Sequence, residues 1–280
     1  MFWKIIILIM AVLALLGVLW INERPVSVIE TPESEVKVLP AEVIEKIGQA
    51  QYDKSFQVPI LLYHYVEYVK DTNDTIRQSL NITPDIFEEQ VKTLSEAGYT
   101  FLTMRELGLI IDDKQALPEK PVVLTFDDGH WDIYTDVWPI LKKHQAKITV
   151  FMITDFINGS DFLSTEQIRE IVGSKEIEIG AHTVHHVSLA YESAQTLKFQ
   201  VEQSKKTLEK DFGLEVVSFA YPNGALDLAA MQAVEDAGYW TAVSTVLGTN
   251  VNKGNRFALY RLRPGRLIGE NLLERLREVN

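Results

Sequence analysis

Short apolar segments that alternate with longer amphipathic segments restrict the fold of this sequence more than any other feature. Runs such as PVVLTF (121–126) and ITVFMI (148–153) show almost no polar alternation, so the strands that they predict must be buried on both faces. Helices between such strands are typical of a parallel sheet that helices cover. A doubly wound sheet and a (β/α) barrel both satisfy this pattern, and both carry function at the carboxyl ends of their strands.

Residue patterns and boundary signals give the expected elements. We expect strands at 58–66, 101–102, 121–126, 148–153, 177–181, 216–221, 241–245 and 259–262. We expect helices at 84–98, 104–111, 132–144, 165–172, 193–212, 226–237 and 270–279. The helix expected at 84–98 illustrates the boundary signals. Thr83 is the expected N-cap, Pro84 takes the first helical position, and Gly98 ends the helix.

The amino-terminal part of the chain differs from the rest in composition and in hydrophobic pattern. Residues 5–21 are apolar and uncharged, follow a short basic start and are bracketed by tryptophans, which is typical of a membrane anchor with a cytoplasmic amino terminus. A cleaved signal peptide is the alternative, although no small-residue cleavage site follows the run. Residues 22–57 are rich in proline and glutamate. We therefore expect an anchor at 1–21, an extracellular linker with at most one helical turn at 22–57, and one folded domain at 58–280.

Charge and composition exclude several classes of protein. The formal net charge of -12 argues against nucleic acid as a partner, because phosphate backbones call for Lys and Arg. The chain has no cysteine, which excludes disulfides and cysteine-ligated zinc. We expect a monomer whose only contact with a membrane is the amino-terminal helix.

Two adjacent carboxylates, Asp127 and Asp128, follow the predicted strand 121–126 in the segment TFDDG. Neighbouring carboxylates repel each other, so a bound cation or an acid–base role would explain the pair. An ordinary turn would explain it as well, since Asp-Gly is a common turn dipeptide.

Two further segments end predicted strands in the same way. HTVHH contains His182 and His186, which can face one ion if the backbone turns after His182, while His185 is expected to pack or to support them. Three of the six histidines fall in this segment, which weakens the interpretation of an ordinary polar side chain. FAYPNG (219–224) predicts a tight loop whose backbone N–H groups can face a ligand, although a simple strand-to-helix turn is the better interpretation of this segment alone.

Together and in this order, TFDDG, HTVHH and FAYPNG resemble the polysaccharide deacetylase family with the NodB homology domain (carbohydrate esterase family 4). The resemblance spans about residues 59–267 and implies an α/β fold, an irregular (β/α) barrel, here preceded by an N-terminal membrane helix. It implies that Asp127 is the catalytic base. It also implies that Asp128, His182 and His186 bind a divalent metal ion, most often zinc.

The resemblance also assigns residues outside the first two motifs. It places the backbone N–H of Asn223 as a donor to the oxyanion. FAYPNG lacks the arginine that tethers the base in the family's common third motif, but Leu259-Tyr260-Arg261 resembles a late Leu-x-Arg element. We therefore expect Arg261 to orient Asp127, with an arginine on a solvated strand edge as the alternative.

The family's usual late catalytic histidine is missing, because no histidine follows His186. PILLYH (59–64) resembles an early segment of extracellular members that act on poly-N-acetylglucosamine. His64 is therefore the candidate general acid, which would protonate the departing amine. His130 and Trp131 follow the TFDDG turn and are expected to shape the substrate groove.

These assignments imply a hydrolase that removes acetyl groups from an N-acetylated polysaccharide outside the cell, such as poly-N-acetylglucosamine or peptidoglycan. An O-acetyl glycan esterase, such as an acetylxylan esterase, is the alternative enzyme, because the same site could attack an ester. A non-catalytic glycan-binding wall module is the alternative class, against which the intact base and metal ligands argue. A metal-dependent sugar isomerase would leave HTVHH and FAYPNG without a role.

Overall fold

The computed structural model of the protein describes residues 38–49, 54–71 and 73–279. The predicted anchor at 1–21 and residues 22–37 of the predicted linker lie outside these ranges. Among the described residues, no helix is both long enough and apolar enough to cross a membrane. The described residues belong to one structural unit, Glu35–Asn280.

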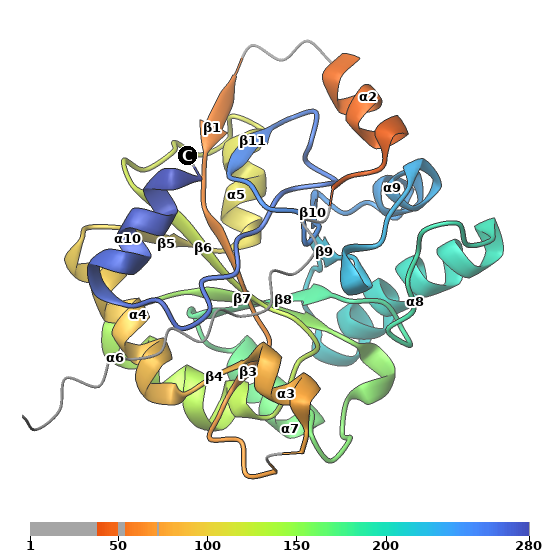
Figure 1. Cartoon of the computed structure of the whole chain (residues 1–280). Coiled ribbons are helices and arrows are strands. Elements are labelled where there is room, and N and C mark those ends of the chain that lie inside the picture. The colour runs from red at the N-terminus through yellow and green to blue at the C-terminus, as the bar shows by residue number, and fades with distance from the viewer. Residues whose placement is uncertain (1–37, 50–53, 72, 280) are drawn as a thin grey trace, which may run out of the picture. The chain divides into compact units, whose positions relative to one another are not determined.

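A seven-stranded parallel sheet forms the centre of this unit (Figure 1). Its strands are β2 (Ile60–Tyr63), β5 (Thr100–Leu102), β6 (Pro121–Phe126), β7 (Ile148–Met152), β8 (Ile177–Ala181), β9 (Ser218–Ala220) and β10 (Thr241–Val243). Six of them run in the order β10-β9-β8-β7-β6-β2, and β5 also pairs with β6. Val123 of β6 pairs with both Ile60 of β2 and Leu102 of β5, so β2 and β5 flank β6 on opposite sides.

Residues 259–262 join the two edges of the sheet. Leu259 forms a parallel bridge with Val243 of β10, and Leu262 forms one with Leu61 of β2. The sheet therefore curls round on itself, which confirms the predicted α/β class and, in coarse form, the predicted irregular barrel. The strand expected at 259–262 is present only as these isolated bridges.

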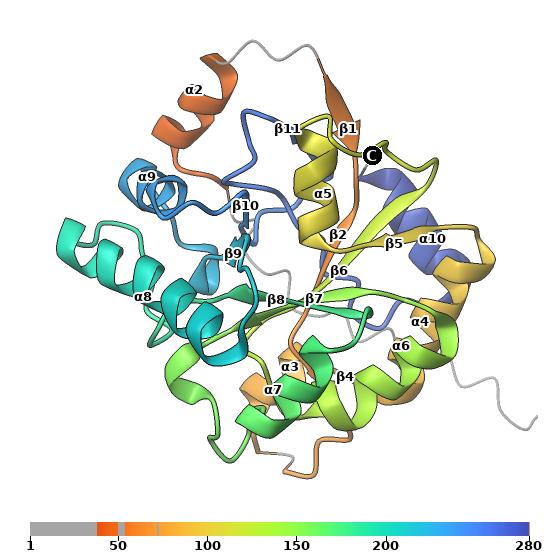
Figure 2. The ribbon, with the colours of Figure 1, turned by 180° about the vertical axis from the view of Figure 1, so that it is seen from behind.

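Apart from α5, helices cover the outside of the curled sheet (Figures 1 and 2). The outer helices are α4 (Pro84–Glu96), α6 (Trp138–His144), α7 (Thr165–Val172), α8 (Ala194–Phe212), α9 (Leu228–Asp236) and α10 (Gly269–Glu278), whereas α5 (Met104–Ile111) lies inside the curl. Thr103 and Ser164 begin α5 and α7 with capping boxes, and left-handed Gly213 ends α8. The helix expected at 132–144 is divided into a π-helical turn η1 (Ile133–Val137) and α6.

Two apolar cores lie on the two sides of the sheet. The larger one fills the space between the strands and the outer helices. The smaller one fills the inside of the curl, where Ile60, Val123 and Phe151 meet α5. Gly180 of β8 leaves room for the Phe151 ring, because a Cβ at this position would lie 2.6 Å from it. The inside of the curl also holds polar residues near the strand starts, where Glu178 of β8 accepts from Thr149 of β7 and Ser218 of β9.

The segment 38–57, which we expected to be the end of a linker, is partly built into the unit. The helix α2 (Ala41–Gln49) buries Val43, and Leu39 just before the helix joins the same core. Within the helix, Val43 and Ile47 are four residues apart and present one face of α2 to the core. The structure therefore differs here from the single helical turn that the sequence suggested.

Two small strand pairs lie near the two ends of the sheet. The strand β1 (Ser55–Gln57) pairs antiparallel with β11 (Asn250–Asn252), and β3 (Tyr65–Val66) pairs parallel with β4 (Asn81–Ile82). Figures 1 and 2 show β1, β11 and α5 at one end, with β3, β4 and α3 (Thr75–Leu80) at the other. Because β3 follows β2 almost directly, the carboxyl ends of β2 and β6 lie toward the β3–β4 end.

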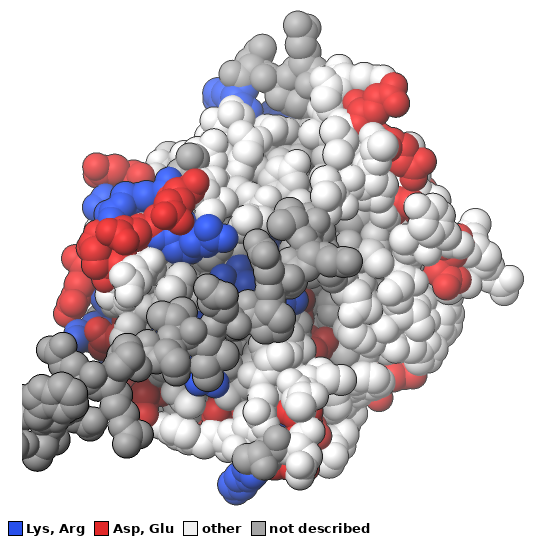
Figure 3. Space-filling view, viewed as in Figure 1, with Lys and Arg blue, Asp and Glu red and all other residues white. Residues whose placement is uncertain are grey.

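Charged side chains are unevenly spread over the face drawn in Figure 3. Acidic and basic side chains are interspersed over α10 on the left of this face, and the right-hand side carries fewer charges, mostly acidic ones. The formal net charge of the whole chain is -12.

Candidate active site

Asp127 follows β6 directly and is held by a buried arginine. Its amide donates to the carbonyl oxygen of Tyr63 at 3.0 Å, which continues the pairing of β6 with β2. Arg261 donates to both carboxylate oxygens, from Nη1 to Oδ1 at 2.7 Å and from Nη2 to Oδ2 at 2.8 Å. Asp127 is 3% exposed and Arg261 is 2% exposed. Arg261 is therefore in direct contact with Asp127, and the alternative of a solvated strand-edge arginine is wrong.

Arg261 is itself fixed by the strand ends around it. Its Nε donates to the carbonyl oxygen of Ser244 at 2.7 Å, and its Nη1 lies 3.2 Å from Oγ1 of Thr125. Burial acts to raise the pKa of Asp127, but the Arg261 guanidinium and the nearby His182 more than offset this, so the pKa lies below its usual value. A carboxylate that is ionised and fixed in orientation can accept a proton from a neighbouring molecule.

Asp128, His182 and His186 lie together beside Asp127. Nε2 of His182 lies 3.5 Å from Oδ1 of Asp128, and Nε2 of His186 lies 3.4 Å from the same oxygen. One ligand atom from each of the three residues lies within 4.8 Å of the others. The backbone is left-handed at Asp128 (φ 73°), Thr183 (φ 68°) and His186 (φ 58°), which is unfavourable for these residue types. The turn that the spacing of HTVHH requires is therefore made at Thr183.

Hydrogen bonds around these three residues leave acceptor atoms facing one another. Nδ1 of His182 lies 2.7 Å from the carbonyl oxygen of Ala220, which can only accept, so the ring proton is on Nδ1 and not on Nε2. Oδ1 of Asp128 is buried and, among the described residues, has no hydrogen-bond partner. Two acceptors 3.5 Å apart repel each other unless a cation lies between them. Asp128, His182 and His186 therefore fit a divalent metal ion.

His64 follows β2, and Asp127 follows the neighbouring strand β6. The register pairs Tyr63 with Phe126, so the residues that follow them, His64 and Asp127, come side by side. Burial lowers the pKa of His64 to about 4, against the opposing effect of the carboxylates of Asp127 and Asp128. His64 is therefore uncharged at neutral pH unless negative charge develops near it.

Asn223 lies in the tight turn η3 (Pro222–Gly224) that follows β9. Its backbone is left-handed, with φ 57°. Gly224 is also left-handed, and a Cβ there would lie 2.1 Å from Oγ1 of Thr245, so only glycine fits this position. Because the carbonyl group of Ala220 at the end of β9 holds a metal-site histidine, the turn lies close to the candidate metal site.

Two other histidines have surroundings that the sequence did not reveal. His130, which we expected in the substrate groove, is 3% exposed, and its Nε2 lies 3.4 Å from Oδ2 of Asp128. The expectation is therefore wrong for His130, whereas Trp131 is partly exposed. Nε2 of His185 lies 2.8 Å from Oδ2 of Asp155, a contact between the loops that follow β8 and β7.

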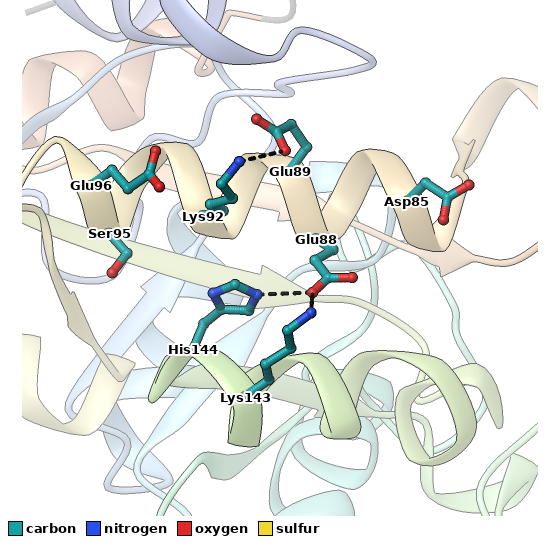
Figure 4. A pocket seen from close by; sticks show the side chains of 8 residues that line it. All are labelled: Asp85, Glu88, Glu89, Lys92, Ser95, Glu96, Lys143 and His144. Carbon is teal, nitrogen blue, oxygen red and sulfur yellow. Dashed lines mark hydrogen bonds and ion pairs between the residues drawn. The ribbon is translucent and has the colours of Figure 1, made fainter.

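A surface groove between α4 and α6 contains none of these residues (Figure 4). Its charged side chains pair with one another, since Lys143 and His144 contact Glu88 at 2.6 Å and 3.0 Å, and Lys92 contacts Glu89 at 3.4 Å. The groove is lined by Asp85, Glu88, Glu89, Lys92, Ser95, Glu96, Lys143 and His144. We interpret it as the seam between two packed helices.

Known proteins share both the motifs and the fold. A family model described as polysaccharide deacetylase matches residues 114–242, which include TFDDG, HTVHH and FAYPNG. Over 243 residues the chain is 31% identical to YxkH of Bacillus subtilis (strain 168), whose name assigns it to the polysaccharide deacetylases. That match covers 86% of this chain and 84% of YxkH.

A second relative and a solved structure extend the similarity. The chain is 29% identical over 174 residues to the poly-beta-1,6-N-acetyl-D-glucosamine N-deacetylase of Staphylococcus aureus (strain MSSA476), covering 58% of this chain and 60% of the relative. The Streptococcus pyogenes deacetylase PplD, solved in complex with acetate, superposes with a TM-score of 0.71 at 28% sequence identity. The superposition covers 79% of this chain and 98% of PplD.

Replacing Arg261 by Met should lower the free energy of unfolding by about 3–5 kcal/mol, because the change leaves a carboxylate buried without its partner. The double variant Asp127→Asn/Arg261→Met should lose less than the sum of the two single variants, since both charges are then gone. Urea denaturation measures these values. The matched control is Arg256→Met, which breaks a more exposed pair with Asp112 and should cost about 1 kcal/mol or less. Equal losses for the two arginines would contradict this prediction.

Proposed function

The chain belongs to the polysaccharide deacetylase family, and we propose that it is a metal-dependent hydrolase that removes N-acetyl groups from an extracellular N-acetylglucosamine polymer, such as poly-N-acetylglucosamine or peptidoglycan. One observation carries this proposal. An ionised carboxylate, Asp127, adjoins three residues that fit a metal ion, namely Asp128, His182 and His186. A base and a Lewis acid at the same carbonyl group are one arrangement that hydrolyses an unactivated amide.

Asp128, His182 and His186 would hold the ion, which we propose to be zinc. When bound, such an ion supplies Lewis-acid polarisation of the acetyl carbonyl and lowers the pKa of a water molecule. Three protein ligands are the number that catalytic zinc sites use, with one position left open. The carbonyl group of Ala220 fixes the ring and the tautomer of His182, as partners of metal-binding histidines do.

We propose Asp127 as the general base that accepts a proton from the attacking water. Its carboxylate is not counted among the ligands, because Arg261 occupies both of its oxygens. Arg261 keeps this carboxylate charged and limits its rotation, so it acts on the reaction through Asp127 rather than by touching the substrate. The short strand register between β2 and β6 holds Asp127 beside His64.

Two further roles are supported by position. The backbone N–H of Asn223 would donate to the oxyanion that forms on the acetyl carbonyl, and the left-handed turn close to the metal site supports this role. His64 would protonate the departing amine. Negative charge on the oxyanion would raise the pKa of His64 from its resting value of about 4, so the imidazole could take up the proton that Asp127 accepts from the water and pass it to the amine.

The substrate class is carried over from a relative and from the segment that contains His64. The name of the Staphylococcus aureus relative specifies poly-beta-1,6-N-acetyl-D-glucosamine, and this chain matches 60% of that protein. PILLYH (59–64) resembles the corresponding segment of family members that act on poly-N-acetylglucosamine. Both observations favour an N-acetylglucosamine polymer over an O-acetylated glycan.

Acetate release from a panel of glycans tests the proposal. With added zinc, the protein should release acetate from poly-N-acetylglucosamine or peptidoglycan faster than from acetylxylan, and chelation should abolish the activity. Asp127→Asn should lower kcat by about 10²–10⁴-fold, because it removes the base. The same variant should still bind one equivalent of zinc. Full activity in Asp127→Asn with metal bound would refute its role as base, and faster release from acetylxylan would indicate an esterase.

A comparison of leaving groups tests His64. His64→Ala should lower kcat on the N-acetylated glycan by about 10²-fold or more, because an amine must be protonated to leave. Activity of the same variant on an acetyl ester of a phenol should change little, since a phenolate leaves without an acid. Asp127→Asn, which removes the base, should reduce both reactions and serves as the comparison. Equal losses on the amide and the ester would show that His64 does not act as the acid.

We also propose that residues 5–21 anchor the chain in the membrane, with residues 58–280 outside the cell. The support is the uncharged apolar run behind a basic start. Fractionation of cells that express the full chain should place it in the membrane fraction, and protease added to intact spheroplasts should digest the catalytic part. Recovery of a shortened chain from the medium would indicate cleavage after the apolar run instead.

A further inference from the structure

His130 is a buried histidine that the mechanism above does not use. It follows the TFDDG turn and is 3% exposed. Its ring stacks between Tyr65, at a centroid distance of 3.9 Å, and Phe162, at 4.9 Å. An antiparallel backbone bridge between His130 and Phe162 fixes the segment as well. Aromatic neighbours on both faces therefore give the imidazole a single defined position.

The turn before His130 determines what its nitrogens face. Gly129 is left-handed with φ 80°, and a Cβ there would lie 2.5 Å from Sδ of Met152, so the turn passes very close to β7. Nε2 of His130 lies 3.4 Å from Oδ2 of Asp128, and Nδ1 lies 3.3 Å from the carbonyl oxygen of Asp161. Both oxygens are acceptors, and the carboxylate is the stronger one. A proton on Nε2 of the neutral ring would therefore face the stronger acceptor, and Nδ1 would then lie beside the Asp161 carbonyl group without donating to it.

The two oxygens of Asp128 thus face different groups. Oδ1 lies 3.5 Å and 3.4 Å from Nε2 of His182 and of His186. Oδ2 lies 3.4 Å from Nε2 of His130, a buried atom that has no hydrogen-bond partner among the described residues. A hydrogen bond from Nε2 to Oδ2 would stop the carboxylate from rotating and would leave Oδ1 facing the two histidines.

We propose that His130 is a positioning residue for the metal site: its Nε2–H holds Oδ2 of Asp128 and keeps Oδ1 directed between His182 and His186. The inference rests on the proposed function, in which these three residues bind a divalent ion. Groups that orient a metal-binding side chain typically contribute a factor of about 10–100 to metal affinity. His130 acts through Asp128, because its buried ring does not reach the substrate.

Zinc affinity of the full chain, freed of metal, tests the proposal. His130→Phe keeps an aromatic ring between Tyr65 and Phe162 but removes both nitrogens. Competition with a chromophoric chelator should give zinc binding about 10–100-fold weaker than wild type, with one equivalent still bound at saturation. His130→Gln places an amide N–H near the position of Nε2 and should recover most of the lost affinity.

Kinetics at two zinc concentrations give a second readout. In His130→Phe, kcat should fall at limiting zinc and recover when zinc is in excess, because the loss lies in binding the ion. KM for the glycan should stay unchanged, since His130 does not touch it. The matched control is His144→Phe, which breaks another pair of a histidine with a carboxylate, 3.0 Å from Glu88 and outside the site, and should change neither quantity.

Three outcomes separate the possibilities. Wild-type affinity in His130→Phe, or equal losses in His130→Phe and His130→Gln, would overturn the inference. A wild-type protein that binds no zinc would instead overturn the proposed metal site, so the two failures are distinct. Thermal melting of the metal-free proteins reports on folding. If His130→Phe does not fold, His130→Asn, whose shorter amide does not reach Oδ2, replaces it in the comparison with His130→Gln.

Discussion

The buried ion pair between Arg261 and Asp127 connects the geometry of the sheet with that of the site. Arg261 lies on the segment 259–262 that bridges both edges of the sheet, and Asp127 ends a central strand. A buried pair adds little net stability, because the cost of removing two charges from water offsets much of their attraction. The pair is therefore better explained by a need for a fixed, charged carboxylate at this point than by a need for stability.

Asp127 and Asp128 are neighbours in sequence but have opposite surroundings. Both oxygens of Asp127 accept hydrogen bonds from Arg261, whereas Oδ1 of Asp128 has no hydrogen-bond partner among the described residues. The left-handed backbone at Asp128 turns the chain sharply after the strand and separates the two side chains. Unfavourable backbone conformations of this kind cluster at functional sites, where the surrounding structure enforces them. The difference in surroundings is the physical basis for assigning one carboxylate as base and the other as ligand.

The sequence predicted the parts of this site that depend on strand ends. Apolar runs located the strands. Because the carboxyl ends of parallel strands lie at the same edge of a sheet, the residues of TFDDG and HTVHH could be predicted to lie close together. The position of His130 could not be predicted, because its partners Tyr65, in β3, and Phe162 are distant in sequence and are brought together only by tertiary packing. The packing of the segment 38–49 was missed for a similar reason, since its short apolar run does not show that Leu39 and Val43 pack against a core built from distant strands and helices.

Arg261 fixes Asp127 but also makes it a weaker base, because the guanidinium helps to hold its pKa below the usual value. A general base works best when its pKa lies near the working pH. The contact with Arg261 therefore lowers the driving force for proton transfer to Asp127. A divalent ion beside Asp128 would make the water more acidic and so offset that loss. The arginine beside Asp127 and the proposed metal ligands therefore complement each other: the first fixes the proposed base, and the ion would make its proton easier to remove.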